Sequence, residues 1–259
     1  MVVQVLTINT VNTVNTILTN PRSKSTTRRH VYLEKTVALL ILLVSISVFI
    51  AALTRVRAAL NHIPVDFGIK KINAKNKLNA AQLTHLINIA ESSITLNDSP
   101  HYLADLSTLL FNQAQLQGLS NTAGLETLKK TEQTLEYALS QSPANAYLWY
   151  RLATVQLLLQ QPAEKVAKTL PLSIMTGPSE AGYLISRLNL CLMLFSAFTQ
   201  DDAELLRIQV INAWTLEPKI FLTSCVYNEE RLNLITHLLV NKHPVIIQNI
   251  RLAFEKINH

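Results

Sequence analysis

The feature that most constrains this chain is an uncharged apolar run near its beginning. Residues 36–54, TVALLILLVSISVFIAALT, contain no charged residue in 19 positions, and only four of the 19 carry a hydroxyl group. As a helix at about 1.5 Å per residue the run would extend about 28 Å, close to the hydrocarbon thickness of a bilayer of about 30 Å. The hydroxyl groups can bond to the carbonyls of their own helix. We therefore predict a single transmembrane helix over residues 36–54.

The run resembles a signal anchor more than a cleaved signal peptide, because it is long and about 35 residues precede it. Five Lys or Arg residues lie within 15 positions before the run and only two lie directly after it, at Arg55 and Arg57. The positive-inside rule then predicts a cytoplasmic N-terminus and a C-terminal part on the other side of the membrane.

Charge is distributed unevenly along the chain, whose formal net charge is +6. Residues 1–79 hold eleven Lys or Arg against two acidic residues, whereas residues 80–259 hold twelve against fifteen. A nucleic-acid-binding domain should carry the positive charge itself, so the acidic balance of the large C-terminal part argues against nucleic acid as a partner. We predict that residues 1–35 form a disordered basic tail and that residues 55–79 form a linker from the membrane to a folded domain.

From residue 80 onward the apolar residues recur at helical steps of three and four, and no alternating strand pattern appears. Prolines divide this part into stretches of roughly 10–20 residues and precede most of them, as expected for the first helical turn. The pattern predicts nine or ten short helices with short connections, and hence an all-α domain over residues 80–259.

The stretch ALSQSPANAYLWYRLA, residues 138–153, makes this prediction more specific. Its small residues, proline, tryptophan and leucine have the spacing of the tetratricopeptide repeat, a family of stacked helical hairpins. A partial second match ends at Pro218, which lies 75 positions after Pro143, and this separation is near the length of two repeats. Gln156, Lys165, Pro171 and Ser224 depart from the family pattern. The residues that carry the resemblance are Ala138, Pro143, Trp149, Leu152, Ala153, Ala213 and Pro218.

The resemblance implies a tetratricopeptide-like α-solenoid in which Trp149 and Leu152 point inward. In that family the first helix of each repeat lines a groove that holds partner peptides. The resemblance therefore implies that some of five side chains contact a partner, namely Tyr147, Tyr150, Arg151, Thr154 and Arg187. The alternative is that the tyrosines pack between hairpins and that Arg151 is solvated.

Motifs of catalysis are absent from the sequence. Its five glycines form no phosphate-binding loop, and neither a nucleophile elbow nor a zinc-protease motif occurs. His237 and His243 lie six positions apart with no acidic residue at ligand spacing, which favours surface histidines over a metal site. We predict no enzyme, no cofactor and no metal-ligating residues. Cys191 and Cys225 lie in apolar surroundings, which favours buried free thiols, although a disulfide is the alternative outside the cytoplasm.

The layout is similar to that of small bacterial inner-membrane proteins with a periplasmic tetratricopeptide domain. That resemblance implies a scaffold or accessory subunit of an envelope process, which binds another protein through its groove. The alternative is a structural subunit that packs through its span and its outer helical faces. Both hypotheses expect the membrane and other proteins as partners and no small-molecule substrate.

Overall fold

The computed structural model of this protein describes residues 23–240 and 242–258. Within these ranges the chain forms α-helices and two short 3-10 helices, with no strand. This result confirms the predicted all-α class. The chain divides into two compact units, residues 1–55 and residues 56–259, which are described separately here.

The first unit contains the N-terminal part of helix α1, Ser23–Asn73. The side chains described there, from residue 35 to residue 55, are all exposed. The helix is long and apolar enough to cross a membrane, since its most apolar 18-residue window has a mean hydropathy of 2.8. Ser47 Oγ donates a hydrogen bond to the carbonyl of Leu43 (2.9 Å), and Thr54 Oγ1 donates one to that of Ala51 (2.9 Å). The helix therefore satisfies these polar groups internally, as the sequence predicted.

Two predictions for the flanks of the apolar run were wrong. Residues 23–35 of the expected disordered tail are helical, while residues 1–22 lie outside the described part of the chain. The expected linker over 55–79 is helical as far as Asn73, and from residue 56 it belongs to the second unit. Ala58, His62 and Val65 are buried there at helical spacing. Burial of this stripe explains why the helix continues through Pro64, a residue that normally disfavours a helix interior.

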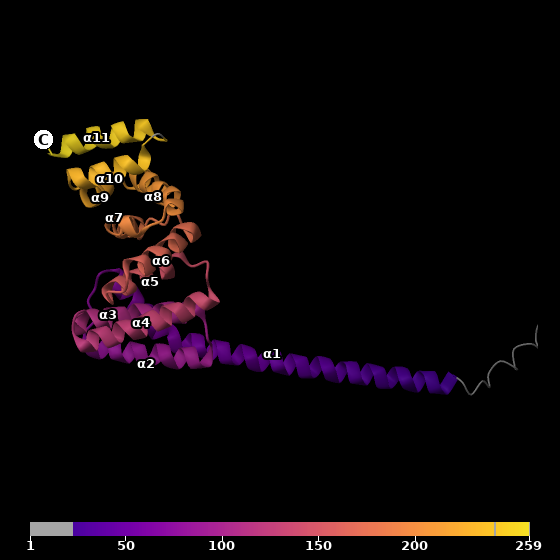
Figure 1. The fold of residues 1–259 in the computed structure, drawn as a ribbon. Coiled ribbons are helices and arrows are strands. Elements are labelled where there is room, and N and C mark those ends of the chain that lie inside the picture. The colour runs from indigo at the N-terminus through magenta and orange to yellow at the C-terminus, as the bar shows by residue number, and fades with distance from the viewer. Residues whose placement is uncertain (1–22, 241, 259) are drawn as a thin grey trace, which may run out of the picture. The chain divides into compact units, whose positions relative to one another are not determined.

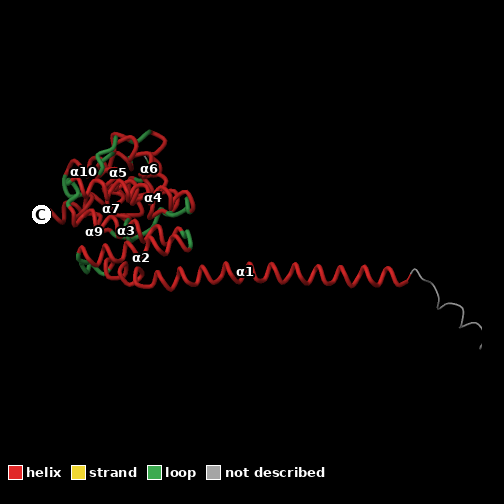
Figure 2. The backbone as a smooth tube through the Cα atoms, turned by 90° about the horizontal axis from the view of Figure 1, so that it is seen from below, coloured by secondary structure: helices red, strands yellow, loops and turns green. Residues whose placement is uncertain are grey.

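Ten α-helices follow α1 in the described part of the second unit (Figures 1 and 2). This number agrees with the nine or ten expected. A pair of 3-10 helices, Phe195–Ala197 and Gln200–Asp202, separates α7 from α8. The ten helices are α2 (Ala80–Leu96), α3 (Pro100–Gln117), α4 (Thr122–Gln141), α5 (Ala146–Leu158), α6 (Ala163–Thr176), α7 (Leu184–Met193), α8 (Ala203–Leu216), α9 (Pro218–Cys225), α10 (Glu229–Leu239) and α11 (Pro244–Asn258).

Local sequence signals set many of these boundaries. Asn79 and Gln82 form a reciprocal capping box at the start of α2, and the side-chain oxygens of Asn145 and Asn228 cap α5 and α10. Proline occupies the first position of α3, α9 and α11. Pro143 departs from this scheme, because it lies in the turn before α5 and leaves the cap to Asn145.

The helices of the second unit stack in chain order (Figure 1). Each helix from α2 to α6 packs on the next, and α8 contacts α6, α7, α9 and α10. Three clusters of buried apolar residues follow one another in the described residues: one joins α1, α2 and α3, one joins α3, α4 and α5, and one extends from α5 to α11. Most of the packing is therefore between neighbours in sequence.

The residues that carry the tetratricopeptide resemblance differ in burial. Ala138, Ala153 and Ala213 are fully buried, so small side chains lie where helices approach closely. Leu152 is also buried, but Trp149 is only partly buried, against the expectation that it fills the interior. Its indole Nε1–H donates a hydrogen bond to the carbonyl of Pro143 (2.7 Å), so Trp149 braces the turn between α4 and α5.

Candidate functional site

Two of the five predicted partner-binding residues line one open hollow on the second unit. Tyr150 and Thr154 reach it from α5, and residues of α7, α9, the turn between α9 and α10, and α10 complete it around a volume of about 370 Å³. We call it the α5–α10 groove. Its wall combines aromatic rings, hydroxyl and amide groups, the thioether of Met193 and one cation. The lining residues are Tyr150, Thr154, Ser186, Asn189, Leu190, Met193, Ser224, Tyr227 and Arg231.

Arg231 supplies the positive charge of this groove. It is partly buried, and its guanidinium lies 5.6 Å from the centre of the Tyr227 ring. Its Nη1 is buried and has no hydrogen-bond partner. A buried guanidinium nitrogen without an acceptor is costly, so an incoming carboxylate or carbonyl oxygen would be stabilised there.

Tyr147 and Arg151 lie elsewhere on α5. Tyr147 lines a separate hollow together with Glu180 and Tyr183. The guanidinium of Arg151 lies over the Phe111 ring, 4.3 Å from its centre, and 5.5 Å from the centre of the Tyr147 ring. Arg151 is therefore packed between aromatic rings of α3 and α5. It neither lines the α5–α10 groove nor is fully solvated, so its position differs from both expectations.

The two tyrosines of α5 also pack against the segment that precedes α7. The Tyr150 ring stacks on Tyr183, with the ring centres 5.3 Å apart and the planes 10° apart, and Tyr147 lies 5.7 Å from the same ring. Burial raises the pKa of Tyr183 above its ordinary value. Tyr150 thus packs against the segment that precedes α7 and also lines the groove, and whether it contacts a partner stays a prediction.

Arg187 was wrongly predicted as a partner-binding residue. It is fully buried, and its guanidinium donates to the carbonyl of Ser173 (2.7 Å), the carbonyl of Gly177 (2.9 Å) and Oε1 of Gln209 (2.9 Å). Burial lowers its pKa from the ordinary value. Since Ser173 and Gly177 lie at the C-terminal end of α6, the cation meets the negative end of that helix. Arg187 is a buried helix cap, inaccessible to a partner.

Both cysteines are buried free thiols, as predicted. Burial raises the pKa of Cys191 and that of Cys225 to about 12. A thiol that resists ionisation is a poor nucleophile and a poor metal ligand, so neither residue offers a reactive site.

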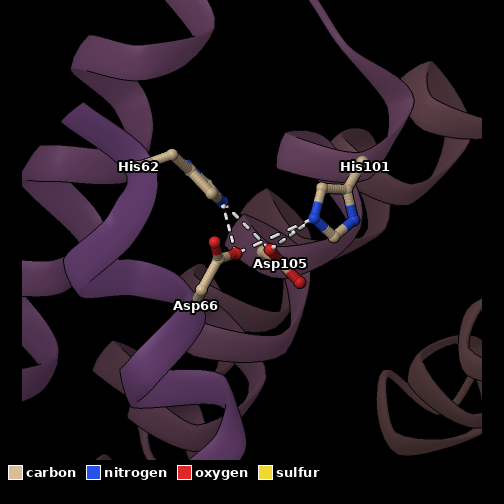
Figure 3. Close-up of side chains that lie close together, drawn as sticks. All are labelled: His62, Asp66, His101 and Asp105. Carbon is tan, nitrogen blue, oxygen red and sulfur yellow. Dashed lines mark hydrogen bonds and ion pairs between the residues drawn. The ribbon is translucent and has the colours of Figure 1, made fainter. Parts of the chain in front are cut away.

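The structure also contains a cluster of two histidines and two aspartates that sequence reasoning missed. His62 and Asp66 come from α1, and His101 and Asp105 come from α3, and the four side chains point toward one another (Figure 3). One ligand atom from each residue lies within 4.8 Å of all the others. The available signal was the pattern His-x-x-x-Asp, which occurs twice, as HIPVD and HYLAD.

Comparison with protein-family models, with curated proteins and with solved structures gives no match for this chain.

Proposed function

We propose that this chain is a single-pass membrane protein whose helical domain binds another protein, without catalysis, through the α5–α10 groove. The apolar run of α1 would anchor it in the inner membrane of a bacterium. The N-terminus would lie in the cytoplasm and the helical domain in the periplasm, where a stack of tetratricopeptide-like hairpins would serve an envelope process as a scaffold or accessory subunit. The stacking of successive helices and the buried small residues at 138, 153 and 213 support the repeat assignment.

The observation that carries the proposal is the unpartnered Nη1 of Arg231 in a groove walled by Tyr150 and Tyr227. A guanidinium beside aromatic rings suits a protein segment that brings a carboxylate together with an apolar or aromatic side chain. We therefore propose that the partner presents an Asp or Glu side chain to Arg231. The local cation matters here, because the domain as a whole carries a slight excess of acidic residues.

Site-specific photocrosslinking in intact membranes tests this proposal. A photoreactive residue replaces Met193, which lines the groove and is 52% exposed, or Met175, a control outside the groove that is 65% exposed. We expect an adduct from position 193 that is absent from position 175. The adduct should disappear in Arg231→Glu and persist in Arg251→Glu, a control that reverses an exposed charge on α11. An adduct that survives Arg231→Glu would refute the proposed role of the groove.

The alternative function, a structural subunit that packs through its span and outer faces, predicts a different result. Exposed apolar side chains on α11, such as Val245 and Leu252, favour it. In that case, replacing residues 36–54 by an unrelated apolar span would release the partner, whereas Arg231→Glu would leave it bound.

A further inference from the structure

We propose that His62, Asp66, His101 and Asp105 bind one divalent transition-metal ion, with Zn²⁺ the preferred ion, and that this ion joins α1 to α3. The proposal concerns a site remote from the α5–α10 groove and does not depend on the function proposed for that groove.

The backbone brings the four side chains together in a simple way. In each His-x-x-x-Asp pair the two residues are four positions apart on a helix, so they lie on the same face. The faces of α1 and α3 are brought into contact by the cluster of buried apolar residues that includes Val65, Leu106 and Leu109. The metal-ligating atoms therefore face one another across two packed helices (Figure 3).

The distances suit a single coordination sphere. His62 Nε2 lies 3.0 Å from Asp105 Oδ2 and 4.0 Å from Asp66 Oδ1, and His101 Nε2 lies 3.6 Å and 3.8 Å from the same two oxygens. Ligands at about 2.0–2.1 Å from a tetrahedral Zn²⁺ are about 3.3–3.4 Å apart. Small side-chain rotations would bring all four atoms to that separation.

The chemistry of the donors selects the class of metal. Two imidazole nitrogens with two carboxylate oxygens suit zinc and its first-row neighbours, while magnesium and calcium prefer oxygen ligands throughout. The two carboxylates also balance the charge of a divalent ion. Among ions of this class, zinc accepts four ligands in a tetrahedron without a further geometric preference.

The cluster is buried on one side and open on the other, which gives an ion a route of entry. The side chains of His62 and Asp105 are 1% and 11% exposed, whereas those of His101 and Asp66 are 65% and 45% exposed. The Tyr102 ring stacks on His62 with the ring centres 4.0 Å apart and so orients the buried imidazole. The second nitrogen of that imidazole, Nδ1, has no hydrogen-bond partner. Since an outer partner normally strengthens a histidine ligand, we expect weaker binding than in a zinc site with a complete outer shell.

Metal titration of the full-length chain tests the proposal. The untagged protein is purified in detergent micelles, stripped with a chelator, and titrated with Zn²⁺ against a coloured competing chelator. We expect one ion per chain and a higher melting temperature with Zn²⁺ than without it. Co²⁺ in the same site should give the intense visible absorption of tetrahedral coordination.

Variants at the exposed ligands keep the test independent of folding. His101→Gln and Asp66→Asn should each weaken Zn²⁺ binding at least about 10-fold, the lower limit for loss of even an outer-shell partner, and should remove the thermal stabilisation by Zn²⁺. Their circular dichroism without metal should match that of the unchanged chain. His85→Gln, at an exposed histidine of α2, is the matched control and should bind as before.

Three results would each overturn the proposal. They are a stripped chain that takes up no stoichiometric Zn²⁺, undiminished binding by both His101→Gln and Asp66→Asn, and an equal loss of binding in His85→Gln. In any of these cases the four side chains would act only as an ion-pair network between α1 and α3.

Discussion

Replacing Arg187 with methionine should strongly destabilise the helical domain. The guanidinium donates five hydrogen bonds, to Ser173, Gly177, Pro178 and Gln209. Methionine has a similar length and no donor group. The substitution would leave the buried carbonyl of Gly177 without its donor, while the carbonyl of Ser173 would keep the backbone N–H of Gly177. It would also remove the charge that faces this end of α6.

The expected magnitude follows from this network. Hydrogen bonds to a charged group contribute about 1.5–3 kcal/mol each, but bonds from a single side chain are not additive. A buried acceptor left without a donor costs about 1–3 kcal/mol, and the carbonyl of Gly177 and Oε1 of Gln209 would both lose the donor that Arg187 supplies, so we take about 3–5 kcal/mol as the expected loss for Arg187→Met. At about 2–4 °C per kcal/mol for a domain of this size, the melting temperature should fall by about 6–20 °C. Arg187→Lys keeps the charge but has fewer donors, so its melting temperature should lie between that of Arg187→Met and that of the unchanged chain.

Thermal unfolding of the full-length chain in detergent micelles, followed by far-UV circular dichroism, measures this effect. Arg251→Met is the control, because Arg251 is exposed on α11 and should be replaceable without loss. A melting temperature of Arg187→Met equal to that of the unchanged chain would refute the argument, since the buried carbonyls would then have found other partners.

Further predictions concern the thiols, the glycines and the tryptophan. Since burial raises the pKa of Cys191 and Cys225 from 9.0 to about 12, their thiols ionise more easily in the unfolded chain. The contribution of the two thiols to stability should therefore be constant below pH 9 and fall between pH 9 and 12. Melting temperatures measured between pH 9 and 12 should fall less in Cys191→Ala than in the unchanged chain. At Gly124 a Cβ would clash with the backbone oxygen of Gly118, whereas at Gly182 it would meet nothing within 4 Å. Gly124→Ala should cost about 1–3 kcal/mol in thermal unfolding and Gly182→Ala less than about 0.5 kcal/mol. Trp149→Phe loses the hydrogen bond that braces the α4–α5 turn and should cost about 0.5–1.5 kcal/mol in the same assay.

The predictions for α5 show which buried positions a repeat pattern identifies and which it does not. The resemblance to the repeat correctly implied that Leu152 and Ala153 are buried and that Tyr150 and Thr154 lie on another face. It misplaced Trp149, because the fully buried side chain here is that of the preceding residue, Leu148. Helical periodicity identifies a face to within about one residue position, and packing with the neighbouring helix decides which residue of that face is covered.

Arg187 was misjudged for a related reason. An arginine within an apolar stretch is predicted to be exposed, since charged side chains are rarely fully buried. Its burial depends on acceptors at the end of α6 and on Gln209, which come from other helices. No pattern within α7 reports that these acceptors are present.

The amino-acid sequence by itself determined the properties that depend on neighbouring residues. Hydropathy and length identified the apolar run of α1, and helical periodicity with proline spacing identified an all-α domain and its number of helices. These features are local, because each helix satisfies its own backbone hydrogen bonds.

The tertiary structure alone decided which distant residues meet. His62 and Asp105 are 43 positions apart, and they lie together because α1 continues as a helix past the apolar run and packs its buried stripe beside α3. The same kind of packing places Tyr150 and Arg231 in one groove and buries Arg187 in the core. Both candidate sites depend on contacts between helices, and a pattern read along one helix does not contain them.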